Sequence, residues 1–145
     1  MRCLVQRVSN ASVEIAGQTV GAIDGGLLIL ICAMADDTEE NAVQMAKKVV
    51  NLRIFSDENG KMNRSLLDIG GAALIVSQFT LAADTSRGNR PGFSSAAPPD
   101  AGNADYQRFC QLVGEFGVAV ETGEFGADMQ VHLINDGPIT IWLDI

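Results

Sequence analysis

Two short polar runs contain the groups that could perform chemistry in this chain. The first reads Asn-Asp-Gly-Pro-Ile-Thr at residues 135–140, between segments 129–134 and 139–145 whose alternating pattern predicts strands. The run is therefore expected to form a tight turn, and its Gly137–Pro138 bond is of the one type that takes the cis form at low cost. A cis bond would hold two carbonyls nearly parallel, as acceptors that test the geometry at one small carbon atom of a ligand. A plain turn is the alternative, because Asp-Gly-Pro is common in ordinary turns.

The second run reads Ser-Gln-Phe-Thr-Leu at residues 77–81 and closes an apolar segment that begins near Ala72. A buried strand should stay apolar, so polar side chains at its end are candidates for a site. The segment offers hydroxyl groups and backbone N–H donors that could stabilise an oxyanion. Thr80 is the first choice as a nucleophile, but a threonine hydroxyl without a nearby base is weak. A positioning role for Thr80 is therefore favoured, with direct attack as the alternative.

The usual machinery of hydrolases is missing from the sequence. His132 is the sole histidine and lies in a predicted strand, and there is no Gly-x-Ser-x-Gly or His-Glu-x-x-His motif. No cluster of His, Cys and carboxylate residues has the spacing of metal ligands, so neither a metal nor another cofactor is expected. The three cysteines are odd in number, widely spaced and flanked by apolar residues, which predicts buried thiols; they are Cys3, Cys32 and Cys110.

The elements that must position these residues follow from the hydrophobic pattern. The 145 residues fit a single domain, 1–145, and the order of elements predicts an α/β (α+β-like) sandwich, rich in strands, with mainly antiparallel sheets and two helices. The loop at 82–103 is long for a compact domain, and loops of that length are often functional. The other expected elements are strands at 4–8, 12–16, 19–23, 27–34, 72–81 and 118–122, hairpins at 54–63 and 129–145, and helices at 38–52 and 104–116.

Several motifs in the same order resemble those of the D-aminoacyl-tRNA deacylase family. The Ser-Gln-Phe-Thr run and the Asn-x-Gly-Pro-x-Thr run are the most specific. The similarity extends from end to end, with one mild difference: Ile139 stands where valine is common in the family. Further matching segments lie at residues 6–8, 11–13, 53–57, 60–63, 81–85, 122–123 and 127–131.

The resemblance implies a fold, a reaction and a set of site residues. The fold would be that of the D-aminoacyl-tRNA deacylases, and the chain would be a carboxylic ester hydrolase that edits translation. Water would attack the ester with help from the ribose 2′-hydroxyl of the tRNA. Ser77, Gln78, Phe79 and Thr80 would form the catalytic segment, and Phe125 and Met129 would line the pocket, with core packing as the alternative for both.

The resemblance also implies how the substrate is selected. In a homodimer, each subunit would insert Gly137 and Pro138 into the partner's site, where their carbonyls reject an L side chain and admit a D side chain. Glycine has no side chain to reject, so glycyl-tRNA mischarged on tRNA-Ala is expected to be hydrolysed as well. Two other functional hypotheses stay open. One is a non-catalytic dimer that binds a nucleotide or a tRNA end, and the other is a threonine-nucleophile esterase that acts without RNA.

The charge limits how such a protein meets RNA. Ten Lys and Arg residues face eighteen Asp and Glu residues, giving a net charge of −8, which argues against contact with many phosphates. The expected partner is therefore the 3′-terminal adenosine of an aminoacyl-tRNA with its ester. Arg87 and Arg90 share one loop, and the basic residues at 53, 61 and 64 share one turn; solvation and phosphate contact both remain open for them. The longest apolar run, 27–35, is too short to cross a membrane, and a cytoplasmic protein is expected.

Overall fold

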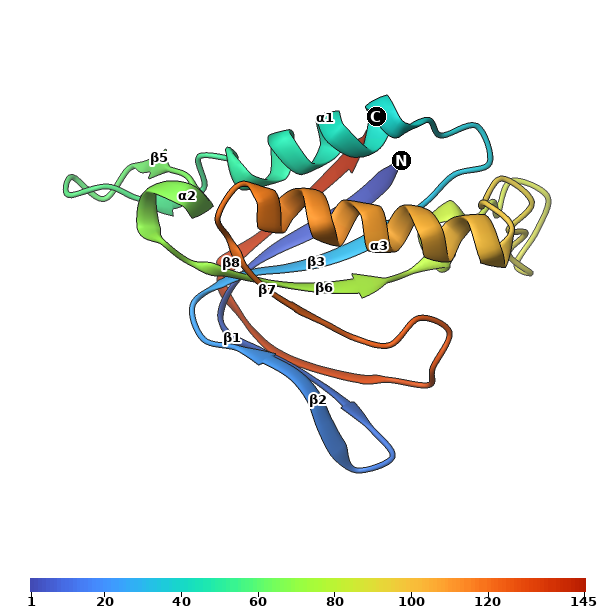
Figure 1. Ribbon diagram of the computed structural model, residues 1–145, viewed down its shortest axis with the longest axis horizontal. Helices are drawn as coiled ribbons and strands as arrows, with labels where there is room; N and C mark the ends of the chain where they lie inside the picture. The colour runs from blue at the N-terminus through green and yellow to red at the C-terminus, as the bar shows by residue number, and fades with distance from the viewer.

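A curved, mixed β-sheet with helices on one face organises the protein. The computed structural model describes residues 1–145. The sheet has the strand order β2-β1-β3-β6-β7, and β8 pairs with the free edge of β1 (Figure 1). The strands are β1 (Arg2–Ile15), β2 (Gln18–Ile23), β3 (Gly26–Cys32), β6 (Ala72–Ser77), β7 (Ala119–Thr122) and β8 (Gln130–Asp144); β4 (Phe55–Ser56) and β5 (Met62–Arg64) form a separate hairpin.

The centre of the sheet is parallel, and its edges are antiparallel. β3, β6 and β7 run parallel to one another, whereas β1 is antiparallel to β2, β3 and β8. Strands buried on both faces read as unbroken apolar runs, which is why Leu27–Ile31 and Ala73–Val76 lack alternation. The expected strand-rich α/β sandwich with mainly antiparallel pairing is confirmed.

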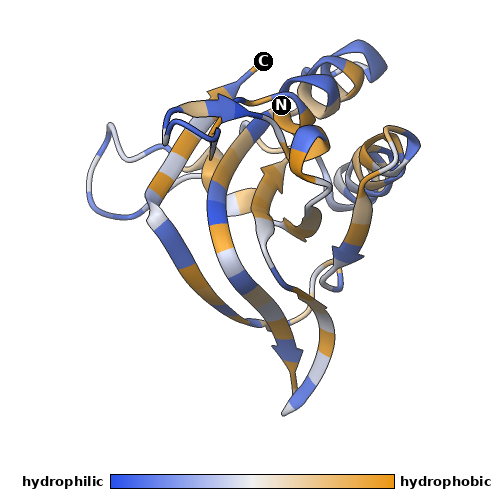
Figure 2. Cartoon of the chain, turned by 90° about the vertical axis from the view of Figure 1, so that its left-hand side faces the viewer, coloured by the Kyte–Doolittle hydropathy of each residue, from blue (hydrophilic) through white to orange (hydrophobic).

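Two amphipathic helices cover one face of the sheet. α1 (Glu39–Val50) and α3 (Pro99–Glu115) lie side by side above it, with their apolar sides turned toward the strands (Figures 1 and 2). Asn41 Oδ1 accepts a hydrogen bond from the Thr38 amide at 2.8 Å and so fixes the start of α1. A third, very short helix, α2 (Leu66–Ile69), was not predicted, and the 3₁₀ helix η1 (Phe79–Ala82) follows β6 directly.

The core has two parts, one on each face of the sheet. The larger part fills the space between the sheet and the helices and includes Leu27, Met45 and Phe109, all fully buried. The smaller part lies where β1 and β8 curve under the sheet, and it includes Val13, Leu74 and Val76. This curvature lets the two long strands serve both layers.

Four boundaries differ from the sequence prediction by more than two residues. The strand expected at 72–81 ends at Ser77, because the chain then turns into η1. The segments 4–8 and 12–16 belong to one long strand, β1, and the segments 129–134 and 139–145 belong to one long strand, β8. The run 135–140 is therefore a bulge within a strand and not a hairpin turn. α3 begins at Pro99 instead of residue 104, because a proline at the first helical position has the right φ and needs no N–H partner.

Candidate active site

An apolar cavity opens at the carboxyl end of β6, where the strand gives way to η1. Its volume is about 760 Å³, and most of its lining side chains are hydrophobic. The lining includes Ser77, Gln78, Phe79, Phe125 and Met129, so five of the eight predicted site residues meet here. A concave, mainly apolar pocket with a few convergent polar groups is the usual form of a small-molecule site.

The end of β6 supplies polar groups to this cavity. The Gln78 amide donates to the Ile31 carbonyl at 2.8 Å, which extends the pairing of β3 and β6 by one residue. The next two amides, those of Phe79 and Thr80, begin a 3₁₀ turn, and the first N–H groups of a helical turn have no carbonyl partner within it. β6 is therefore followed by two adjacent first-turn N–H groups, one of them from the lining residue Phe79.

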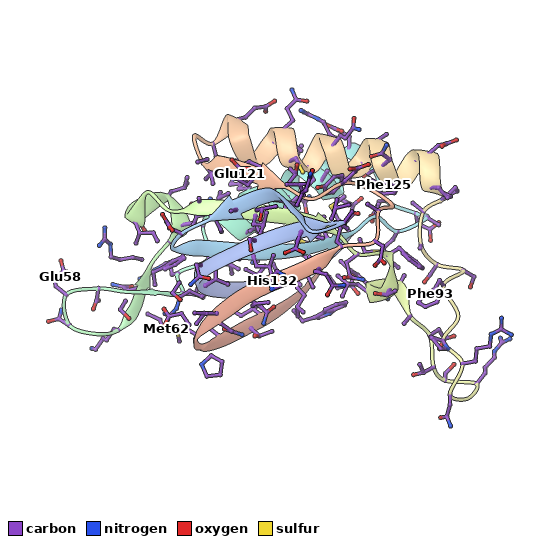
Figure 3. The ribbon with its side chains drawn as sticks, turned by 90° about the horizontal axis from the view of Figure 1, so that it is seen from below. Glu58, Met62, Phe93, Glu121, Phe125 and His132 are labelled. Carbon is purple, nitrogen blue, oxygen red and sulfur yellow. The ribbon has the colours of Figure 1, made fainter.

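Thr80 lies next to the cavity but is not part of its lining. Its side chain is exposed, and its hydroxyl oxygen accepts a hydrogen bond from Nε2 of Gln78. No base contacts this hydroxyl. His132 lies on an exposed part of β8 and faces Glu14 at 3.7 Å, so it takes no part in the cavity (Figure 3).

Aromatic side chains from four segments also line the cavity. Phe79 packs edge-on against Phe93 from the long loop, with ring centroids 5.0 Å apart. Phe125 faces Tyr106 of α3 at 6.1 Å. Figure 3 shows Phe93 and Phe125 at the same end of the molecule. Met129 lines the cavity and also packs on the smaller core, so the pocket and core roles coincide.

Sequence reasoning missed several lining residues. Tyr106 lies in the helix predicted at 104–116 and was not predicted as a site residue, yet it lines the cavity while its hydroxyl donates to the Ile75 carbonyl at 2.9 Å. Burial raises the pKa of Tyr106 and keeps the phenol neutral. Asp128 is the only acidic side chain of the lining. Helical spacing alone could not separate a lining tyrosine from a core one, but the position of Asp128 beside Met129 was a usable signal.

Gly137 and Pro138 are not among the residues that line this cavity. Their peptide bond is cis, and both residues are exposed. The register of β1 and β8 moves from Gln6 opposite Thr140 to Val8 opposite Asn135, so residues 136–139 bulge out across from a single residue. The chain does not bring the bulge into its own cavity.

The bulge is held by side chains from within and beneath it. Asn135 spans it: its Nδ2 donates to Oγ1 of Thr140 at 2.8 Å, and its Oδ1 accepts from the Ile139 amide at 3.0 Å. These bonds explain why the run needs Asn and Thr at its two ends. A Cβ on Gly137, whose φ is +127°, would lie 2.9 Å from Cγ1 of Ile139.

Arg7 fixes the bulge from below, and sequence reasoning did not assign it to the site. Its Nη1 donates to the Ile54 carbonyl at 2.7 Å, and its Nε contacts the carbonyl and carboxylate of Asp136 at 3.2 and 3.0 Å. The side chain is only 12% exposed. Because Arg7 stands opposite residues 136–139 in the ladder, one guanidinium joins the bulge to the segment before β4.

Comparison with known proteins identifies the family. A family model described as D-Tyr-tRNA(Tyr) deacylase matches residues 4–144. The chain belongs to this family. Proteins named D-aminoacyl-tRNA deacylase from Jannaschia sp. (strain CCS1) and Ruegeria pomeroyi are each 65% identical to it. The match covers 99% of this chain and 98% of the Jannaschia protein. For the Ruegeria protein it covers 100% of both chains.

Solved structures agree with the deacylase fold. One named c-Myc DNA Unwinding Element Binding Protein is 38% identical, covers 100% of this chain and 99% of its own, and has a TM-score of 0.94. Another, titled as a probable eukaryotic D-amino acid tRNA deacylase, is 21% identical with a TM-score of 0.86 over 99% and 98% of the two chains, which shows a shared fold. The chain is thus a member of a family of ester hydrolases that act on aminoacyl-tRNA. None of its helices could span a membrane.

Proposed function

We propose that this chain removes D-amino acids from tRNA by hydrolysing the ester of D-aminoacyl-tRNA and spares the L ester. The observation that carries the proposal is the apolar cavity beside the first-turn N–H groups of η1, just after β6. Such donors stabilise the oxyanion that forms when a carbonyl is attacked. Family membership agrees with this chemistry.

The reaction needs no side-chain nucleophile. An aminoacyl-tRNA ester is intrinsically activated, so placing it against fixed N–H donors can accelerate its hydrolysis. The hydroxyl of Thr80 is bound to Gln78 and has no base beside it, which supports a positioning role. Water then attacks the ester with assistance from the ribose 2′-hydroxyl of the substrate. Direct attack by Thr80 is the alternative mechanism.

Selection against L esters is assigned to Gly137 and Pro138 of a second copy of the chain. Two observations support this: the dipeptide is exposed, and it lies outside its own chain's cavity. Ile134 and Trp142 are 57% and 47% exposed on the same strand, and they give a second copy apolar surface to cover. In such a homodimer, the Gly137–Pro138 carbonyls face the chiral carbon, so an L side chain collides with them and a D side chain points away.

The substrate proposed for the cavity is the 3′-terminal adenosine with its amino acid. The apolar lining suits the base, and Asp128 provides an anion that complements the ammonium group of the amino acid. Glycyl-tRNA, including glycine mischarged on tRNA-Ala, passes the same filter because glycine has no side chain to reject. Aminoacyl-tRNA is used in the cytoplasm, and the protein is assigned there for that reason.

Release of amino acid from D- and L-tyrosyl-tRNA, with a chelator present, tests the proposal. Rapid loss of the D ester alone is the expected result, and equal stability of both esters would place the chain among non-catalytic binding proteins. A substrate whose terminal ribose lacks the 2′-hydroxyl tests the mechanism. Its hydrolysis should fail if RNA assists the reaction and should continue if Thr80 is the nucleophile.

A further inference from the structure

The loop from Asp84 to Gly92 is a closed structure that leads directly from the cavity. Its two ends pair with each other: the Asp84 amide donates to the Gly92 carbonyl at 2.8 Å, and the Gly92 amide donates back at 2.9 Å. The nearest lining residues of the cavity before and after the loop are Phe79 in η1 and Phe93. The paired ends therefore fix the position of the loop tip relative to the cavity.

The loop and its flanking residues carry a positive net charge, whereas the rest of the chain is acidic. Residues 76–99 contain Arg87 and Arg90 against one acid, Asp84, while the rest of the chain has eight basic and seventeen acidic residues. The Asp84 carboxylate accepts a hydrogen bond from the Ser86 amide at 2.9 Å, and this bond lowers its pKa. The one acid is thus used to shape the loop. The two arginines give the loop its local positive charge.

Most other cations of the chain are engaged or distant from the cavity. Ion pairs hold Arg2, Arg7 and Arg108, and the guanidinium groups of Arg53 and Arg64 donate to backbone carbonyls. Arg87 and Arg90 are exposed and make neither an ion pair nor a hydrogen bond. Figure 3 shows the loop that carries Phe93 reaching outward at the cavity end, opposite the β4–β5 hairpin with Glu58 and Met62.

We infer that Arg87 and Arg90 bind the backbone phosphates of the nucleotides that precede the terminal adenosine. The inference rests on the proposed function, which places that adenosine in the cavity. A strand that leaves the cavity past Phe79 and Phe93 meets the positive loop first, and a guanidinium binds phosphate oxygens in bidentate geometry. The acidic remainder of the surface repels the body of the nucleic acid. The loop then provides the main electrostatic contact to RNA, which reconciles a net charge of −8 with an RNA substrate.

Two measurements on the full-length protein test the inference. The first is RNA binding by wild type and by the double variant Arg87→Gln/Arg90→Gln. The probe is a fluorescent RNA hairpin that carries no amino acid and has a short single-stranded 3′ tail. Two single-strand phosphate contacts predict that raising salt from 50 to 200 mM weakens wild-type binding about sevenfold more than it weakens binding by the variant. The second is hydrolysis of D-tyrosyl-tRNA and of 3′-O-D-tyrosyl-adenosine, which has no phosphate. The variant should raise the KM for the tRNA ester about tenfold, leave kcat unchanged and leave the adenosine ester unaffected.

Matched variants separate the effect of the two loop arginines from the effect of overall charge. Lys47→Gln/Lys48→Gln removes the same charge from the exposed side of α1 and should change neither measurement. Asn89→Ala alters the tip without altering charge and should also have no effect. Equal RNA binding by the wild type and the arginine variant would overturn the inference, even if D-tyrosyl-tRNA is hydrolysed. If no ester is hydrolysed but the arginine variant binds RNA more weakly, the loop's role stands and the proposed hydrolysis falls.

Discussion

The cavity at the end of β6 and the bulge on β8 are opposites in shape and construction. The cavity is concave and apolar, and its wall is gathered from β6, α3, the long loop and the segment before β8. The bulge is exposed, and one arginine with one Asn–Thr pair holds it. The cavity could bind a ligand, but neither Gly137 nor Pro138 is among its lining residues. The bulge has rigid carbonyls but no pocket. Under the proposed function, the reaction needs both regions, supplied by two copies of the chain.

Crowding the bulge should have the largest effect. In Gly137→Ala the new Cβ would lie 2.9 Å from Cγ1 of Ile139 and 3.1 Å from its nitrogen, at a φ of +127° that L side chains rarely adopt. The carbonyls must then shift, and displacement of about 1 Å in a positioning group can cost about a hundredfold in rate. We expect a loss of that size in kcat/KM for D-tyrosyl-tRNA.

Gly17→Ala is the matched control for this variant. Gly17 also has a positive φ, +81°, but a Cβ there meets no atom within 4 Å. It shares the backbone strain without the crowding and should lower the melting temperature while keeping the activity. Unchanged turnover in Gly137→Ala would remove the bulge from the mechanism.

Removing the arginine that holds the bulge should weaken discrimination between D and L esters. Arg7→Ala removes the bonds to Ile54 and Asp136, and hydrogen bonds to a charged group contribute about 1.5–3 kcal/mol each. The ratio of D to L hydrolysis should fall about tenfold or more. Arg108→Ala, which breaks two exposed ion pairs with Glu39 and Glu115, should keep the ratio. A ratio in Arg7→Ala equal to that of wild type would show that the bulge is rigid without the arginine.

A change at Thr80 tests the cavity side of the comparison. Thr80→Ala removes a hydroxyl that accepts from Gln78, and the loss of one hydrogen bond of about 1 kcal/mol lowers a rate about fivefold. Single-turnover rates on D-tyrosyl-tRNA should show that modest loss. Complete loss, restored by Thr80→Ser, would instead identify Thr80 as the nucleophile.

The smallest effect should be on stability at high pH. Burial raises the pKa of the Cys110 thiol to about 11 from its usual value near 9, so the folded state binds a proton that the unfolded state releases between these values. A raised pKa contributes stability below the unfolded pKa, and this contribution is lost as pH rises through the folded one. Urea midpoints should therefore fall between pH 8 and pH 11, and less in Cys110→Ala. A parallel decline in both proteins would show that Cys110 does not contribute.

Much of the fold follows from local pattern, but the shape of the long strands does not. The helical period of α1 and the unbroken apolar runs of β3 and β6 identify these elements from sequence. The split of β8 into a hairpin was wrong because a polar interruption has the same local signature in a turn and in a bulge. Only the pairing with β1, more than a hundred residues away, decides between them.

The same limit applies to the site. Ser77 to Phe79 could be predicted because polar residues end an apolar strand, and the family resemblance predicted Phe125 and Met129, which line the same cavity. Arg7 could not be assigned, since its partner Asp136 lies 129 residues along the chain. The catalytic roles of all these residues, and that of Gly137 and Pro138, stay predictions.

Complementation between two inactive variants tests most directly whether the two regions act across a dimer. Gly137→Ala breaks the bulge and keeps the cavity, and Ala96→Trp places an indole in the cavity and keeps the bulge. Each protein alone should be folded, dimeric and inactive on D-tyrosyl-tRNA. After the two are mixed and allowed to exchange subunits, about a quarter of wild-type activity should return, because half of the dimers are mixed and each has one complete site. No return of activity, with mixed dimers present, would contradict the account.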